Sequence, residues 1–239
     1  MQSIGRGTHF ASAVLAAASV LCGLASVAEA KRPGGRHCAG GVCHRVMTLE
    51  QTEGEIGKVR HLKASHYDDC RRDRFNPCGL TSSGEVFRPH MPDNAASAIH
   101  PDGTILVLRN PETRLSAVVR VNNFGPFRGG RKLDVSRATA ERLGFARRGV
   151  TSLEVMVVYA PTPAETRYAR RRTYDPVPGF IGSAPSIDTA YLRYADLTYH
   201  RRVATLDAVA CQIARKKRRA PGLKLIAASW QRLTRLAGN

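Results

Sequence analysis

Short apolar runs separated by turn residues dominate the middle of the chain. The run 104–108 lies between Asp-Gly and Asn-Pro turns, and a second run, 115–121, follows after a short polar segment. Two such runs joined by a short turn predict a β-hairpin. Residues 152–159 alternate apolar and other side chains, which predicts a third strand. We therefore expect a compact β-rich domain over about 57–160.

A short helix is predicted between the second and third of these strands. Ser136 can cap its first turn, and the helix can run through Leu143 until Gly144 ends it. Ala140 and Leu143 would then face the β-rich core.

The residue composition and the hydrophobic pattern change after the third strand. Residues 161–239 begin as a basic linker rich in Arg, Pro and Gly and continue as two helix-like segments, about 188–215 and 223–236. In the second segment the apolar residues fall on one face and the basic residues elsewhere. Such a helix either docks on the β domain or lies on an anionic membrane surface.

The N-terminus has the pattern of a signal peptide over residues 1–30. Arg6 precedes the uncharged apolar run 11–27, and Ala-Glu-Ala at 28–30 is a small-x-small cleavage pattern. An uncleaved N-terminal anchor is the alternative. Cys22 follows a bulky Leu, so we do not expect a lipoprotein anchor there. Residues 31–56 then read as a basic N-terminal arm.

The net charge of +18, from 37 Lys and Arg against 19 Asp and Glu, indicates a polyanionic neighbour. Export makes nucleic acid an improbable partner, which leaves the membrane surface or an acidic wall polymer.

The cysteines favour disulfides over a metal site. In an oxidising compartment the simplest pairs are Cys38 with Cys43 and Cys70 with Cys78, and Cys211 is left over. A four-cysteine zinc site is the alternative, but its usual CxxC spacing is absent. The histidines are scattered, so we expect no metal and no organic cofactor.

Five ordered blocks resemble those of the rare lipoprotein A family. They are Lys-Ala-Ser-His-Tyr at 63–67, Ser-Gly-Glu-Val-Phe at 83–87, Ala-Ala-Ser-Ala-Ile-His at 95–100, Arg-Val-Asn-Asn-Phe-Gly-Pro-Phe at 120–127 and Arg-Lys-Leu-Asp-Val-Ser at 131–136. The resemblance implies a mainly β fold, a six-stranded double-psi β-barrel with a groove across one face, followed here by a basic helical extension.

The resemblance also implies an activity on peptidoglycan. Members of this family cleave the linkage between N-acetylmuramic acid and N-acetylglucosamine and leave a 1,6-anhydromuramoyl end. One carboxyl group with a raised pKa can serve such a reaction, first as acid and then as base. The partner would be a peptidoglycan glycan strand.

Carried over by position, Glu85 and His100 match two family site residues, and the third, an Asp, is replaced by Asn123. An amide cannot exchange a proton at neutral pH. Asp134 matches a groove Asp that expansin-like barrels also carry, and its alternative role is to favour the start of the helix after Ser136. The alternative function is therefore a non-catalytic, expansin-like barrel that binds glycan.

Three further residues are candidates for glycan contacts. Tyr67 can offer an aromatic face to a sugar, although a Tyr at the end of a strand often only packs. Arg120 and Arg131 can hold the muramoyl carboxylate, or be solvated charges on the rim.

Overall fold

The computed structural model describes residues 31–69, 71–72 and 79–219. In chain order the elements are β1 (Arg36–Ala39), β2 (Val42–Arg45), α1 (Leu49–Glu53), β3 (Val59–Tyr67), β4 (Asn94–Ser97), β5 (Ile105–Arg109), β6 (Leu115–Asn123), β7 (Leu133–Ser136), α2 (Arg137–Arg142), β8 (Val150–Tyr159), α3 (Pro163–Thr166), β9 (Gly179–Ser183) and α4 (Ile187–Arg219).

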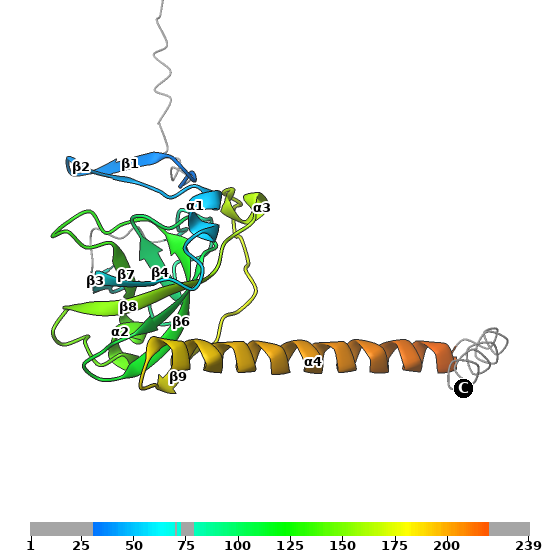
Figure 1. Ribbon diagram of the computed structural model, residues 1–239. Helices are drawn as coiled ribbons and strands as arrows, with labels where there is room; N and C mark the ends of the chain where they lie inside the picture. Colours follow the sequence, from blue (N-terminus) through cyan, green and yellow to red (C-terminus); the bar gives the residue numbers. More distant parts are fainter. Residues whose placement is uncertain (1–30, 70, 73–78, 220–239) are drawn as a thin grey trace, which may run out of the picture.

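Six of the strands close into a barrel (Figure 1). Their hydrogen-bonded order is β4-β7-β3-β8-β5-β6, and β6 pairs with β4 to complete the circle. The β3–β7 and β4–β6 pairs are parallel, and the other pairs are antiparallel. Closure leaves no open edge among the six. The prediction of a mainly β, six-stranded barrel is confirmed.

The predicted hairpin and helix form as the sequence indicates. In the hairpin Leu106 lies opposite Val119, and both side chains are fully buried. The Ser136 side chain accepts a hydrogen bond from the Thr139 backbone and caps α2. Ala140 and Leu143 lie in the core, and a left-handed glycine follows the helix.

Residues 31–56 are folded onto the barrel, which the linker-like composition did not predict. They form the β1–β2 hairpin, which carries a disulfide between Cys38 and Cys43, and the short helix α1, which begins at a Thr48 capping box. The Met47 backbone N–H donates to the Ile99 carbonyl at 2.8 Å. Cys70 and Cys78, the other expected pair, lie outside the described residues.

The expected linker after the barrel also contains structure. It holds α3 and β9, and β9 pairs antiparallel with the first part of β6, ahead of the residues of β6 that pair with β4. Arg109 donates to the Ala184 and Pro185 carbonyls at 2.8 Å each and fixes the start of α4.

The helix α4 runs through the basic stretch to Arg219 and projects away from the barrel (Figure 1). Ile187 and Ala190, in its first turns, pack against the barrel. The helix-like segment 223–236 lies outside the described residues, so its membrane role stays a prediction. In the part of the chain described, no helix combines the length and the apolar character that a bilayer span requires.

Candidate functional site

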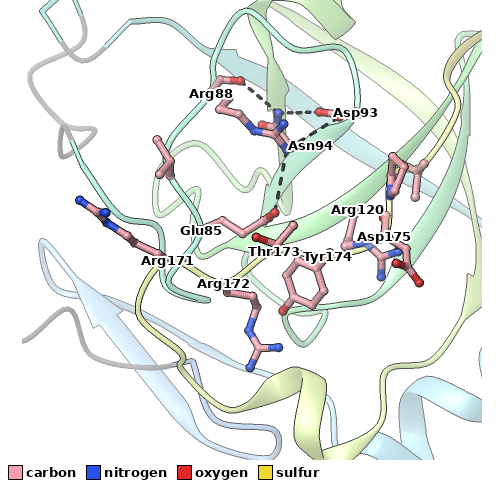
Figure 2. Close-up of a pocket in the computed structure, with 13 residues that line it drawn as sticks. Glu85, Arg88, Asp93, Asn94, Arg120, Arg171, Arg172, Thr173, Tyr174 and Asp175 are labelled. Carbon is pink, nitrogen blue, oxygen red and sulfur yellow. Dashed lines mark hydrogen bonds and ion pairs between the residues drawn. The ribbon is translucent and has the colours of Figure 1, made fainter.

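Glu85 lies in a pocket of about 480 Å³ (Figure 2). It follows a tight turn in which the Thr81 N–H donates to the Glu85 carbonyl at 2.8 Å and the Gly84 N–H donates to the Thr81 carbonyl at 2.9 Å. Glu85 is only 7% exposed, so it is not the solvated surface carboxylate that a Gly-Glu in a polar stretch usually gives. The pocket is lined by Glu85, Val86, Arg88, Asp93, Asn94, Arg120, Arg171, Arg172, Thr173, Tyr174, Asp175, Pro176 and Val177.

The surroundings of Glu85 together raise the pKa of its carboxyl group above the ordinary value. Burial raises the pKa of Glu85, while the Asn122 amide, which donates to Oε2 at 2.8 Å, and the Arg88 guanidinium, 3.9 Å from Oε1, act in the opposite direction. Burial is the largest of these effects. A carboxyl group with a raised pKa holds its proton closer to neutral pH, as a general acid must.

Arg120 contributes a buried cation to the same pocket. It projects from β6, is 8% exposed, and donates to the Gly103 carbonyl and the Asp175 carbonyl at 3.1 Å each. Its Nε has no hydrogen-bond partner among the described residues. The structure thus brings together two of the predicted site residues, Glu85 and Arg120.

A second group of polar residues lies buried inside the fold, and we call it the Lys31 centre. It consists of Lys31, Ser82, Ser97, His100, Asp102 and Asn123. The Lys31 ammonium is 2.8 Å from Asp102 Oδ1 and donates to the Ser97 and Asn123 carbonyls at 3.2 and 2.9 Å. Both side chains of the ion pair are fully buried. The Asn123 side-chain oxygen accepts from the Ser82 backbone at 3.1 Å.

His100 belongs to the Lys31 centre and is 3% exposed. Its Nδ1 is 2.9 Å from Ser97 Oγ. Burial, reinforced by the positive charge of Lys31, lowers the pKa of His100 to about 4. His100 is therefore neutral at neutral pH, and it is not among the residues that line the Glu85 pocket.

Asp134 lies in a third place, on β7 beside β3. It is half-buried and accepts a hydrogen bond from Ser65 Oγ, which in turn accepts from Arg131 Nη1 at 2.6 Å. Neither Asp134 nor Arg131 lines the Glu85 pocket. Tyr67 is 2% exposed, contacts Phe87 and hydrogen-bonds Asn94, so its ring packs inside the barrel and offers no face to a sugar.

Comparison with known proteins identifies the barrel. Residues 59–155 match the family model described as lytic transglycolase. This part of the chain is a lytic transglycolase domain. It is distantly homologous to the endolytic peptidoglycan transglycosylases RlpA of Vibrio cholerae, 33% identical over 88 residues, and of Yersinia pestis, 33% identical over 109 residues.

These alignments cover 37% and 44% of this chain, and 33% and 26% of the two relatives. The chain thus spans a third or less of the length of these two curated relatives. Among solved structures, an expansin of Clavibacter michiganensis aligns at 19% identity and a TM-score of 0.30, over 44% of this chain and 52% of the expansin.

The lytic transglycolase domain does not supply the whole pocket. Its match ends at residue 155, and the pocket residues 171–177 follow later in the chain. Nothing in the sequence marks Tyr174, and Lys31 stands in a stretch whose composition is typical of a linker. The sequence could have pointed to Asn122 as a site residue, because it directly precedes the position of the family Asp.

Among the described residues there is no group of three or more His, Cys, Asp or Glu side chains placed to hold an ion. Cys38 and Cys43 are joined to each other, so they are not available as zinc thiolates.

The buried state of His100 predicts a loss of stability in acid. Because its pKa of about 4 lies below the ordinary 6.5, the unfolded chain takes up the proton first as the pH falls. The stability that neutral His100 contributes is fully present above pH 6.5 and is lost toward pH 4, about 3 kcal/mol in all. Denaturant unfolding at about pH 7 and pH 4.5 should show a smaller loss for His100→Gln than for the native chain. Equal losses in the two proteins would contradict this assignment.

Proposed function

We propose that this chain is an exported lytic transglycosylase that cleaves peptidoglycan glycan strands endolytically, with Glu85 as its acid and base. The observation that carries the proposal is the buried, pKa-raised Glu85 carboxyl group in the polar pocket of a lytic transglycolase domain. The homology to peptidoglycan transglycosylases supplies the substrate class. The signal-peptide pattern of residues 1–30 supports action outside the cytoplasm.

The reaction needs a single group that first gives and then takes one proton. Protonated Glu85 donates to the glycosidic oxygen, the bond from that oxygen to C1 of the muramoyl ring breaks, and positive charge develops on the ring. The C6 hydroxyl of the same sugar then attacks C1. Its proton returns to the Glu85 carboxylate, so the enzyme ends in its starting state. No water is activated, and no second carboxylate is required.

The residues around Glu85 suit these two roles. The Asn122 amide orients the carboxyl group through Oε2, which leaves Oε1, with Arg88 at 3.9 Å, as the oxygen that is less firmly held. Arg88 favours the carboxylate that exists after the first proton transfer, and burial favours the acid that exists before it. We assign Asn122 and Arg88 to positioning.

One observation favours the alternative of a barrel that binds glycan without cleaving it. Asn123 stands where the family has an Asp, and its side-chain oxygen accepts from the Ser82 backbone. An amide held in this way cannot exchange a proton. Under this alternative Arg120 and the pocket would serve binding alone.

Product analysis separates the two functions. The native chain is incubated with intact and with peptide-stripped sacculi, and soluble fragments are identified by mass spectrometry. We expect fragments with 1,6-anhydromuramoyl ends. Sacculus binding without any release of fragments would contradict the proposal and leave the binding barrel. A gain of release in Asn123→Asp would then attribute the missing activity to that position.

A further inference from the structure

The segment that follows α3 crosses the loop that carries Glu85. We call residues 167–177 the strap. Two backbone hydrogen bonds join it to this loop, from the Ala169 N–H to the Ser83 carbonyl at 3.2 Å and from the Arg172 N–H to the Gly84 carbonyl at 3.1 Å. Figure 2 shows the strap residues Arg172, Thr173 and Tyr174 beside the Glu85 side chain. The strap therefore forms one wall of the pocket.

Gly84 is the residue that allows this close approach. Its φ is +93°, and a Cβ atom at this position would lie 2.0 Å from the Ala169 carbonyl oxygen. No side chain fits in that space, and the atom in the way belongs to backbone. The glycine that precedes Glu85 thus serves the strap as well as the turn.

Tyr174 attaches the strap to the buried arginine of the pocket. The Arg120 guanidinium lies 4.9 Å and the Arg172 guanidinium 5.0 Å from the centre of the Tyr174 ring. Cations over an aromatic face attract it more strongly when they are desolvated, as Arg120 is. The Tyr174 hydroxyl donates to the Glu165 carbonyl at 2.7 Å, and Arg120 also donates to the Asp175 carbonyl.

We propose that the strap, which lies outside the residues that match the lytic transglycolase family, is part of the catalytic site and that Tyr174 is a positioning residue for Glu85. The strap keeps water from the Glu85 carboxyl group and directs the Tyr174 backbone amide toward it. This inference rests on the proposed function for its catalytic meaning, while the contact between strap and Glu85 is independent of any substrate.

The strap accounts for part of the burial that sets the acidity of Glu85. Burial raises the pKa of Glu85, and the hydrogen bond from the Tyr174 backbone lowers it by a smaller amount. Displacing the strap removes its part of the burial together with this hydrogen bond. Since burial is the larger, we expect the pKa of Glu85 to fall toward its ordinary value of 4.5 when the strap is displaced.

Two pairs of variants test the strap. In each pair, one variant should displace the strap and the other, its control, should leave it in place. Gly84→Ala drives a methyl group into the Ala169 carbonyl, and its control Gly149→Ala carries the same left-handed strain, at φ +78°, with no atom within 4 Å of the new methyl group. Tyr174→Ala removes the ring from the two guanidinium groups, and its conservative control Tyr174→Phe keeps the ring and loses the hydrogen bond to the Glu165 carbonyl. All four are made in the full chain, and unfolding curves establish that each folds.

The first measurement is the titration of the Glu85 carboxyl group by carbon-13 NMR without substrate, assigned with Glu85→Gln. We expect its pKa to fall toward 4.5 in Gly84→Ala and Tyr174→Ala, and to keep its native value in both controls. A native titration in Gly84→Ala and Tyr174→Ala would overturn the proposal. This result does not depend on whether the chain cleaves glycan.

The second measurement is fragment release from sacculi as a function of pH. Release requires protonated Glu85, so the decline of release with rising pH should begin at a lower pH in the two strap variants than in their controls. Faster release after displacement would make the strap an inhibitor and would also overturn the proposal. The native chain could release no fragments while the pKa of Glu85 shifts in the strap variants as expected. This result would refute the proposed function and leave the strap as a structural cover of Glu85.

Discussion

Replacing Glu85 by Gln should lower the release of anhydromuramoyl fragments at least about 100-fold. The substitution keeps the size and the hydrogen-bonding capacity of the side chain, but an amide can neither give nor take the proton that the reaction moves. Burial raises the pKa of the Glu85 carboxyl group, which suits it to act as the acid, and Asp93 and Asp175 are the other carboxylates that line the pocket. The initial rate of fragment release from peptide-stripped sacculi, read by mass spectrometry, measures the loss.

The controls for this prediction come from carboxylates outside the pocket. Glu112 is exposed and pairs with Arg148 on the surface, so Glu112→Gln should release fragments at the native rate. Asp134→Asn tests the other candidate acid, which the structure places with Ser65 and Arg131. If Asp134→Asn abolishes release and Glu85→Gln does not, the acid has been assigned to the wrong residue.

Replacing Lys31 by Met should cost about 3–5 kcal/mol of the free energy of unfolding. The change leaves the Asp102 carboxylate fully buried without its ammonium partner, and it removes the donor to the Ser97 and Asn123 carbonyls. Urea unfolding at neutral pH measures the loss. This cost is large compared with the total stability of most domains, so the variant should unfold at a much lower denaturant concentration.

A double variant shows whether the buried charge is responsible. In Lys31→Met with Asp102→Leu neither charge remains, and most of the lost stability should return because both partners are replaced by apolar groups. Lys58→Met removes an exposed lysine that pairs with Glu55 and should change stability by less than about 0.5 kcal/mol. A small effect of Lys31→Met would contradict the view that the N-terminal segment is anchored in the core.

The sequence predicts three of the strands because they carry strong local patterns, whereas the barrel itself is what the family resemblance implies. The runs that form β5, β6 and β8 are rich in apolar residues; β5 and β6 pair in the expected hairpin, and β8 pairs with β5 on its other side. Ser136 and the glycine after Leu143 mark the ends of α2 through side-chain and backbone conformations that few other residues supply. Local chemistry of this kind can be read without knowledge of distant contacts.

The site is less accessible to such reading because distant segments build it. Lys31 stands among Arg, Pro and Gly residues typical of a linker, and only its contact with Asp102, which is distant in sequence, makes it a core residue. The strap has a similar composition. Its docking position is visible only in the structure, where its backbone lies so close to Gly84 that a Cβ atom would not fit between them. His100, which the resemblance placed at the site, lies instead in the Lys31 centre, where burial keeps it neutral.

The most direct test of the central claim is the fate of water oxygen during cleavage. The native chain and Glu85→Gln are incubated with peptide-stripped sacculi in water labelled with heavy oxygen, and the new strand ends are weighed. Attack by the C6 hydroxyl predicts ends that lack one water and carry no label, formed by the native chain and not by the variant. Labelled reducing ends would show hydrolysis. Intact sacculi that still bind the native chain would show a glycan-binding barrel, and either outcome would contradict the account.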